Sequence, residues 1–455
     1  MKNQKDITYT TITGNYTVPS QETLRAIDPV SGSFVLQGKT QYAYDGYTSL
    51  TVRSGVPNHT GNTSATNRGN LTTITHHKDG NDCVVANHNC IVENMKYDSV
   101  GNVVEKDDGL SHATSIYFDD SFCTLGTSGN CTNTSGHSTF AYPTTVTNAL
   151  NQSATTQYDY NTGLPTVATN LRGNSTKTKY DLMNRTTSII EPNGKQTTYA
   201  YDDTNRITTK EVAVDTASNT PGTIAGNKGH VETSFDQLYR VIDTRTNDSD
   251  PAGVIAVDTV YDGKSRKTQV SNPYRLSSES PIWTTTTFDA LDRPVQIQAP
   301  DGSVVQYAYA FNQTTVTDEA GSARRYTYNP LGQMTKVEEP NPSLVWNTPL
   351  VTTYVYYGFG PLYRTNQSSQ LRTFVNNWLS QMTSQTLPES GTTTFSYDDA
   401  GRLTAKTDAR SITATMSYDN ANRPTGVTRR IDTGGQQRAG SGANHSGDAR
   451  GETAA

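Results

Sequence analysis

The sequence has few apolar residues for its length. Hydrophobic side chains make up 33% of the 455 residues, and the mean hydropathy is −0.66. Adding the 35 glycines brings the apolar share to roughly 41%, below the ~45–50% of an ordinary globular domain. Tyrosine (26) outnumbers phenylalanine (10) and tryptophan (3), so most aromatic rings carry a hydroxyl that needs a partner when buried. The composition therefore argues against one thick hydrophobic core and favours thin layers.

The sequence also lacks an excess of one charge and any long apolar run. The net charge is −6, and the lysines and arginines are scattered, so nucleic-acid binding is not expected. No segment approaches the ~18 apolar residues of a membrane span, and residues 1–6 lack the apolar core of a signal peptide. We therefore expect no membrane span, and either export by a route other than a signal peptide or a true N-terminus that is missing from this sequence.

Cysteine is scarce, and the four cysteines fall in two local pairs. Cys83 with Cys90, and Cys123 with Cys131, each lie in a stretch rich in Thr, Asn, Ser and Gly. Two disulfide-closed loops in an oxidising compartment would explain this arrangement best. Free thiols are one alternative. A metal site is another, because histidines at 76, 77 and 88 lie near the first pair, although the spacing matches no standard zinc pattern.

An aromatic residue followed by aspartate recurs along the whole chain. Successive copies lie as little as 21 or 22 residues apart, and longer steps indicate loop insertions. A period in this range indicates an array of supersecondary units. The copies are Tyr44-Asp45, Tyr97-Asp98, Phe118-Asp119, Tyr158-Asp159, Tyr180-Asp181, Tyr201-Asp202, Phe235-Asp236, Tyr261-Asp262, Phe288-Asp289, Tyr397-Asp398 and Tyr418-Asp419, with Tyr328-Asn329 as a near match.

Further residues stand at fixed offsets from this pair. Five residues after the aromatic stands Arg185, Arg206, Arg240, Arg266, Arg293, Arg402 or Arg423. The residue before this position is often Gly101, Asn184, Asn205, Gly332, Gly401 or Asn422, and seven residues before the aromatic stands Gly173, Gly194, Gly302 or Gly321. Glycine and asparagine tolerate positive φ, so these positions predict two tight turns in each unit.

The residues between the turns alternate between apolar and polar. Val295 and Ile297 share one face, as do Val305, Tyr307 and Tyr309 after the next turn. This period of two predicts strands, so each unit is a β-hairpin. One hairpin is marginal alone, whereas hairpins stacked side by side supply each other with partners. We therefore predict an all-β fold of tandem antiparallel β-hairpins in one continuous sheet.

The repeated residues are interpreted as architecture, because a group needed for chemistry is not needed many times. Tyrosine would pack on the sheet, aspartate would accept N–H bonds in its turn, and arginine would pair with an aspartate of its own or a neighbouring unit. The sequence has no phosphate-binding loop, no Gly-x-Ser-x-Gly elbow and no His-Glu-x-x-His. We therefore predict no enzyme activity and no cofactor.

Units such as residues 201–206 and 397–403 closely resemble RHS/YD repeats, the family of bacterial polymorphic toxins, shell components of insecticidal toxin complexes and teneurins. The resemblance implies a ribbon of sheet spiralling into a hollow barrel or cocoon, open or partly closed, around an effector cargo. Bacterial members commonly cleave themselves at an aspartate near an Asp-Pro signal. Only fragments of that signal appear, at Asp28-Pro29 and Asp250-Pro251, so we expect no self-cleavage.

The expected organisation has four parts. Residues 1–41 are a weakly patterned lead-in, 42–157 are degenerate repeats with cysteine-containing insertions, 158–430 are the repeat array, and 431–455 are a disordered Gly/Ala/Ser-rich tail. We expect either a repeat segment cut from a larger protein or the product of a gene truncated near its end.

The predicted function is that of a non-catalytic shell segment of a secreted or cell-surface bacterial protein. Its partners would be a cargo polypeptide or the remaining shell of a larger RHS protein. The alternative is an adhesin-like surface module that binds glycans or a partner protein through the two cysteine loops.

Overall fold

The computed structural model describes residues 3–12, 16–46, 50–56, 68–84, 88–125, 131–134, 139–213, 228–247, 253–340 and 348–431. In this part of the chain all regular structure is β, in one sheet of 35 strands, and the predicted all-β fold is confirmed. The strands are β1 (Gln4–Ile12), β2 (Tyr16–Ile27), β3 (Phe34–Tyr44), β4 (Leu71–His77), β5 (Cys90–Tyr97), β6 (Val103–Asp107), β7 (Ala113–Tyr117), β8 (Phe122–Leu125), β9 (Cys131–Thr134), β10 (Thr145–Thr147), β11 (Ser153–Asp159), β12 (Pro165–Thr169), β13 (Ser175–Tyr180), β14 (Thr186–Ile190), β15 (Gln196–Asp202), β16 (Ile207–Ala213), β17 (Lys228–Phe235), β18 (Val241–Asn247), β19 (Val254–Tyr261), β20 (Lys267–Ser271), β21 (Tyr274–Arg275), β22 (Trp283–Phe288), β23 (Pro294–Gln298), β24 (Val304–Ala310), β25 (Gln313–Thr317), β26 (Ala323–Tyr328), β27 (Met334–Glu339), β28 (Leu350–Tyr356), β29 (Leu362–Gln367), β30 (Gln370–Asn376), β31 (Met382–Leu387), β32 (Gly391–Tyr397), β33 (Leu403–Thr407), β34 (Ile412–Tyr418) and β35 (Pro424–Ile431).

Most strands pair antiparallel with the next strand along the chain, as hairpins require. The main departure is the β8–β9 hairpin, which is inserted between β7 and β10. Strands β7 and β10 pair directly with each other, and β8 of the β8–β9 hairpin forms a short parallel contact with β11. An insertion thus leaves the continuity of the sheet intact.

The sheet has two rims formed by two kinds of turn. The turns after the repeated aromatic residues, such as 181–185 and 289–293, make one rim, which we call the Asp rim. The alternate turns, such as 191–195 and 299–303, make the other, which we call the Gly rim. The ladder register shifts by one residue at the aromatic of most units, for example at Tyr180 and Phe288. Such bulges bend a strand and increase its twist, so their repetition curves the sheet.

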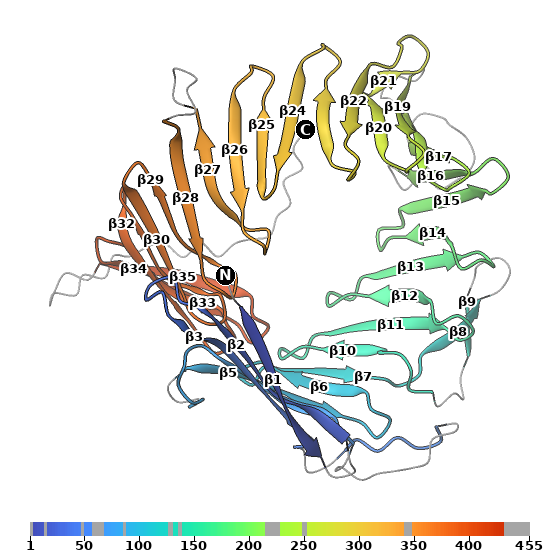
Figure 1. The fold of residues 1–455 in the computed structure, drawn as a ribbon. Helices are drawn as coiled ribbons and strands as arrows, with labels where there is room; N and C mark the ends of the chain where they lie inside the picture. The colour runs from blue at the N-terminus through green and yellow to red at the C-terminus, as the bar shows by residue number, and fades with distance from the viewer. Residues whose placement is uncertain are drawn as a thin grey trace.

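The curved sheet winds through more than one turn of a spiral, so its last strands lie against its first (Figure 1). Direct contacts join residues more than 310 positions apart in the sequence, such as Gln37 with Gly358 and Lys78 with Asp399. In the described part of the chain no strand ladder closes the sheet into a barrel. Successive turns of the spiral instead meet rim to rim, through loops and side chains.

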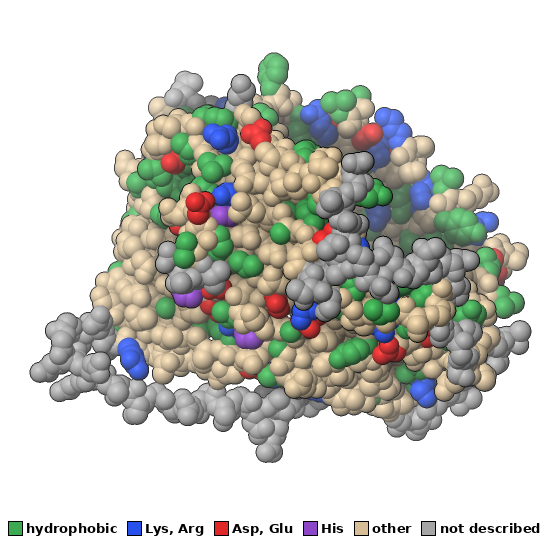
Figure 2. Space-filling view, turned by 90° about the horizontal axis from the view of Figure 1, so that it is seen from below, with side chains coloured by type: hydrophobic (Ala, Val, Ile, Leu, Met, Phe, Trp, Pro, Cys, Tyr) green, Lys and Arg blue, Asp and Glu red, His purple; other side chains and the backbone are tan. Residues whose placement is uncertain are grey.

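The interior of this sheet is thin, as the composition predicts. Among the described apolar residues, only seven are buried, four of them alanine or cysteine. Figure 2 shows a surface on which apolar and charged side chains are dispersed among polar ones. Stability must therefore come from many small contacts spread along the array.

The structure describes most of the N-terminal part of the predicted organisation, but its C-terminal tail lies outside the described residues. The predicted lead-in, residues 1–41, contains β1, β2 and most of β3, which belong to the same sheet as the repeats. The tail after residue 431 and the Asp250-Pro251 pair lie outside the described residues.

Candidate functional site

The most regular feature of the molecule is a cluster repeated on the Asp rim. In the unit after β22, Oδ1 of Asp289 accepts backbone N–H bonds from Leu291 and Arg293, at 2.9 and 3.0 Å. Oδ2 of Asp289 accepts the Nε–H of Arg293 at 2.8 Å. The guanidinium lies 4.1 Å from the ring centroid of Tyr309, one strand pair further along. We call this cluster a rung, because it joins one unit to the next.

The hydroxyl of the stacked tyrosine completes the rung. The Tyr309 hydroxyl donates to the carbonyl of Pro294 at 2.8 Å, which places the ring against the strand that follows Arg293. Equivalent hydroxyl bonds to backbone carbonyls of the preceding unit are made by Tyr97, Tyr158, Tyr180, Tyr201, Tyr356, Tyr397 and Tyr418. The excess of tyrosine in the composition thus has a structural use, since each buried hydroxyl finds a partner.

The same guanidinium position recurs in four more units. In each, the arginine donates Nε–H to its own aspartate and lies 4.2–4.8 Å from the next aromatic ring. The rungs are Asp181–Arg185–Tyr201, Asp236–Arg240–Tyr261, Asp262–Arg266–Phe288 and Asp398–Arg402–Tyr418. Asp419 and Arg423 form the same ion pair at the last described turn.

Arginine lowers the pKa of the aspartate in two of these rungs. The guanidinium of Arg240, followed by backbone N–H groups, lowers the pKa of Asp236, and Arg266 does the same for Asp262. Burial raises the pKa of the Tyr309 hydroxyl. Both carboxylate oxygens thus accept bonds from donors of the same turn, an arrangement that stabilises the turn.

Two of the predicted motif positions depart from this pattern. Asp202 accepts its bonds from Thr204 and Asn205, while Arg206 donates to the carbonyl of Phe235 at 3.4 Å. Arg206 itself has the positive φ, 56°, that the sequence assigned to Asn205. The reason is local: β15 pairs with β16 in regular register, without the bulge found in the other units.

Asp159 is the other departure, because no arginine follows it. It is almost fully buried and accepts bonds from the amide and hydroxyl of Thr162. The glycines predicted at the turns have the expected backbone, with φ of 82° at Gly194, 87° at Gly302 and 77° at Gly401.

In two rungs amides replace both charged groups; the sequence marked the first, Tyr328-Asn329, as a near match and missed the second, at Asn377. Asn329 accepts N–H bonds from Leu331 and Gln333, and its own Nδ2 donates to the Gln333 side chain at 2.8 Å. Asn377 and Gln381 repeat this geometry at 2.7 Å. The available signal was asparagine at the aspartate position followed by glutamine four residues later.

A further rung receives its arginine from a distant segment. Asp98 has Asn102 at the arginine position, and it accepts bonds from the amides of Val100 and Asn102. Nε of Arg53 donates to Oδ2 of Asp98 at 3.2 Å, and its guanidinium lies 4.9 Å from the ring of Phe140. Arg53 therefore takes, from 45 residues away, the place of the missing repeat arginine.

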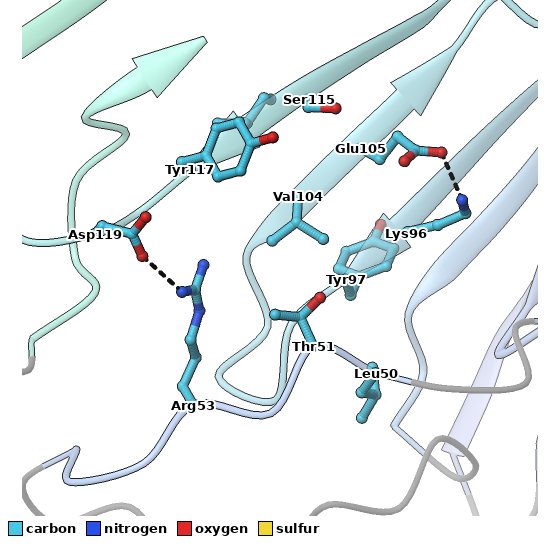
Figure 3. Close-up of a pocket in the computed structure, with 11 residues that line it drawn as sticks. Leu50, Thr51, Arg53, Lys96, Tyr97, Val104, Glu105, Ser115, Tyr117 and Asp119 are labelled. Atoms are coloured by element: carbon cyan, nitrogen blue, oxygen red, sulfur yellow. Dashed lines mark hydrogen bonds and ion pairs between the residues drawn. The ribbon is translucent and has the colours of Figure 1, made fainter. Parts of the chain in front are cut away.

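The segment that carries Arg53, residues 50–56, lies along the unit it completes. Thr51 forms a parallel bridge with Asp98 and accepts the N–H of Ser99 at 2.9 Å. Between this segment and β5 to β7 lies a cavity of about 500 Å³ (Figure 3). Its charged lining groups are paired, Arg53 with Asp119 at 2.9 Å and Lys96 with Glu105 at 2.6 Å.

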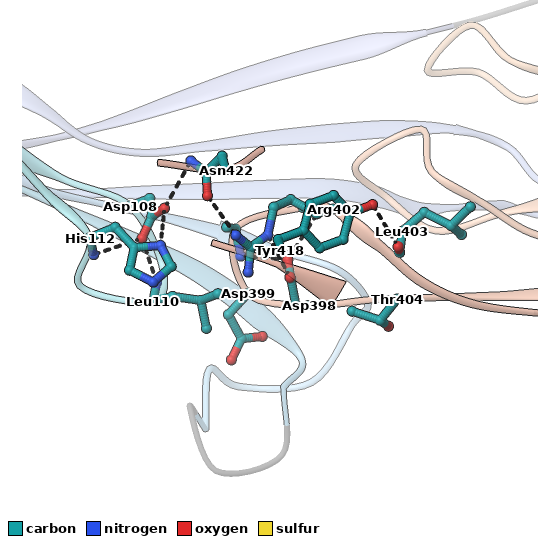
Figure 4. Close-up of polar contacts among 12 residues, drawn as sticks. Asp108, Leu110, His112, Asp398, Asp399, Arg402, Leu403, Thr404, Tyr418 and Asn422 are labelled. Atoms are coloured by element: carbon teal, nitrogen blue, oxygen red, sulfur yellow. Dashed lines mark hydrogen bonds and ion pairs between the residues drawn. The ribbon is translucent and has the colours of Figure 1, made fainter. Parts of the chain in front are cut away.

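The rim-to-rim contact between successive spiral turns forms a second polar cluster, which we call the seam. Its centre is Asp399, nearly buried, which pairs with Nζ of Lys78 at 3.1 Å and with Nδ1 of His88 at 2.5 Å. Nearby, Arg402 donates to Asn422, which donates to Asp108, which also bonds His112 (Figure 4). In each pair that crosses the seam here, the second turn contributes its Asp rim and the first turn its Gly rim.

The seam leaves no room for side chains at two glycines. A Cβ at Gly109 would overlap the carbonyl oxygen of Asp399, and one at Gly358 would overlap the Cβ of Ala26. Gly358 also bonds Gln37 and Asn3 of the first turn, at 3.0 and 2.8 Å. At Asp108, burial raises the pKa, but the amides of the turn outweigh it and the net shift is downward.

The cysteines are joined within each local pair. Cys83 bonds Cys90 and Cys123 bonds Cys131, each with a Cα–Cα distance of 5.4 Å. The nearby histidines have separate partners: His77 bonds Gln41 and Asn81, and His88 bonds Asp399. Among the residues that the structure describes, no three metal-binding side chains gather, and no helix could cross a membrane.

Comparison with known proteins identifies the repeat. The RHS repeat family model matches residues 180–217, 310–342, 379–413 and 397–437. No curated protein is significantly similar in sequence.

Three solved structures share the fold. They are TcdB2-TccC3 without the hypervariable C-terminal region (TM-score 0.70, 8% identity), TcdB2-TccC3-Cdc42 (0.69, 9%) and the Photorhabdus luminescens Tc holotoxin pore (0.68, 10%). Each match covers 96% of this chain and 29–30% of the other. The chain thus spans less than a third of those chains, and identity this low shows the fold alone.

Proposed function

We propose that this chain is a wall segment of a larger shell, because the RHS repeat model matches four of its stretches and its fold is the shell fold found in TcdB2-TccC3. In this role it encloses a polypeptide cargo, in a secreted or cell-surface bacterial protein, and it catalyses no reaction. The observation that carries the proposal is the seam, where two turns of the spiral meet rim to rim. A wall needs such a joint, because gaps between turns would admit water and proteases.

The rungs support the same role. In each rung the aspartate accepts bonds from turn amides and from arginine, which fixes the conformation of the turn. The contact of the arginine with the next aromatic ring then ties this turn to the following repeat unit. Rungs at six or more sites suit a continuous wall better than a single binding site.

The test is cargo protection in the complete protein as its producing cells make it. Gly109→Ala places a methyl group where the Asp399 carbonyl lies and should open the seam. Gly263→Ala is the matched control, because a Cβ there meets nothing within 4 Å. We expect the enclosed polypeptide to resist protease in the parent and the control, and to be cleaved in Gly109→Ala. Equal cleavage in all three proteins would refute the enclosing role.

An adhesin-like surface module is the alternative. Of its two cysteine loops, the Cys83–Cys90 loop is engaged in the seam through His88. The Cys123–Cys131 hairpin is the better candidate, since it is inserted outside the run of the main sheet. Binding to a glycan array that is lost when residues 122–134 are shortened would support this alternative.

A further inference from the structure

A second cavity, of about 500 Å³, lies on the face of β31 to β35, beside two turns of the Gly rim and away from the seam. The two turns, 387–391 and 408–412, pack closely, since a Cβ at Gly391 would lie 2.8 Å from the Cβ of Ala409. The side chain of Thr393, which lines the cavity, is buried. The cavity is therefore a hollow of the sheet and its turns.

The register of the sheet places a small residue between two bases in this cavity. Ala414 on β34 pairs with Lys406 on β33 and with Arg429 on β35, so the three side chains lie side by side on one face. Adjacent strands are about 4.8 Å apart, which separates the two bases by about 10 Å at the backbone. The methyl group of Ala414 leaves the space between the two long side chains open, so both can contact a group bound there.

The acidic groups near the cavity already have partners. One oxygen of Asp408 accepts both the Nε–H and the Nη2–H of Arg410, at 3.0 and 2.7 Å. Glu389, in the neighbouring turn, pairs with Arg372 at 2.5 Å. The guanidinium of Arg410, followed by the amide of Ile412, also lowers the pKa of Asp408. These acids therefore do not neutralise the remaining bases of the cavity.

Two basic side chains of the cavity have no acidic partner. In the part of the chain that the structure describes, the side chains of Lys406 and Arg429 form no ion pair and donate no hydrogen bond. Nζ of Lys406 contacts only the ring of Phe395, 5.9 Å from its centroid. Two positive charges thus stand on either side of the space above Ala414.

We propose that this cavity binds a small phosphate monoester, such as a sugar phosphate, with its phosphate group between Lys406 and Arg429. A phosphate monoester has nearly two negative charges at neutral pH and three acceptor oxygens, which match the two bases, whereas a carboxylate would leave one base uncompensated. The cavity is larger than a phosphate group. Its further lining residues Gln385, Ser390 and Thr393 offer amide and hydroxyl groups to the rest of the molecule. The site goes beyond the enclosing role and does not depend on it.

Calorimetric titration of the complete protein at low salt tests the site with four probes: glucose 6-phosphate, inorganic phosphate, sulfate and acetate. At about pH 7.5 we expect glucose 6-phosphate to bind more tightly than inorganic phosphate, and acetate to bind at least about tenfold more weakly than either. Tighter binding of inorganic phosphate would overturn the monoester, and equal binding of acetate would overturn the site.

The charge of the ligand is tested by lowering the pH to about 5. Phosphate groups then lose one negative charge, because their second pKa is about 6, whereas sulfate stays doubly charged. Among the described lining residues there is no histidine, and the lowered pKa of Asp408 keeps that group charged. Both phosphates should therefore bind more weakly at about pH 5 and sulfate should not. Phosphate binding that is independent of pH would overturn the match of charges.

Matched variants locate the site on one face of the sheet. Arg429→Gln should weaken glucose 6-phosphate binding by about tenfold or more, whereas Arg430→Gln should not, because Arg430 points to the opposite face of β35. Ala414→Leu fills the space between the bases and should abolish binding with both charges kept. Thr415→Leu, on the opposite face of β34, is its control. Equal losses in Arg429→Gln and Arg430→Gln, or full binding in Ala414→Leu, would overturn the site.

Discussion

Arg53 gives the sharpest test of the rung as a structural unit, because its loss can be repaired from a different position. Asp98 is fully buried, and the Arg53 side chain that pairs with it is only 12% exposed. Removing one partner of a buried ion pair costs about 3–5 kcal/mol. Asp98 keeps bonds from two amides and the Asn102 side chain, so we expect Arg53→Ala to cost about 2–3 kcal/mol in local stability.

The repair is Asn102→Arg, which restores the repeat arginine in its usual place. Nδ2 of Asn102 already reaches Oδ2 of Asp98 at 3.2 Å, the atom that accepts Nε–H in the regular rungs. In the Arg53→Ala background, the new guanidinium can occupy the vacated position over Phe140. With Arg53 present, two guanidinium groups would compete for one site. Asn102→Arg should therefore destabilise the parent and stabilise Arg53→Ala.

The assay is amide hydrogen exchange at residues 98–103, because an array unfolds locally and a single transition temperature would average over many units. We expect faster exchange in Arg53→Ala, near-parent exchange in the double variant, and no change in Arg410→Ala, whose ion pair is exposed. Additive effects of the two substitutions, or unchanged exchange in Arg53→Ala, would show that Arg53 does not complete a rung.

Three further outcomes follow from the rungs and turns. Tyr309→Phe removes the hydroxyl bond to Pro294 and should lower local stability by about 1 kcal/mol, measured by exchange; no effect would mean that the hydroxyl bonds do not hold the strands. Gly194→Val should cost about 1–2 kcal/mol because φ is 82°, although a Cβ would meet nothing within 4 Å; Gly194→Asn is the milder control, and equal losses would contradict the φ argument. Acid should also weaken the array: the folded-state pKa of Asp262 lies below its unfolded value of about 3.9, so its contribution is complete above that pH and is lost as the pH falls through the folded pKa. Unfolding followed between pH 5 and pH 2 should show this loss, reduced in Asp262→Asn, and a pH-independent stability would contradict it.

Much of the fold could be read from the sequence because the information is local. The aromatic–aspartate pair, the arginine four residues after the aspartate and the turn glycines all act within one hairpin. Asp289 and Arg293 bond each other across four residues, and Gly302 has the positive φ of its own turn. Prediction from the sequence failed where a unit departs from the common pattern. At Arg206 the β-bulge found in most units is missing, and at Asn377 and Gln381 amide side chains replace the aspartate and arginine.

The candidate site divides in the same way. Predicting that arginine pairs with aspartate required only the repeat, whereas the ring over which each guanidinium lies belongs to the next unit. The role of Arg53 could not be predicted, because no residue near it in the sequence marks it as the partner of Asp98. Its role depends on the path of residues 50–56 alongside a unit 45 residues later.

The sequence by itself determined that this protein is a tandem array of β-hairpins, because period-two alternation and turn residues act over a few positions. Only the tertiary structure decided how the array curves, which rim meets which, and why Gly109 and Gly358 must lack side chains. Those features depend on bulges accumulated over many units and on contacts more than 310 residues apart in the sequence. The bend that each repeat adds is too small to be recognised in the sequence of one repeat. Its effect appears only where the last strands of the spiral meet the first.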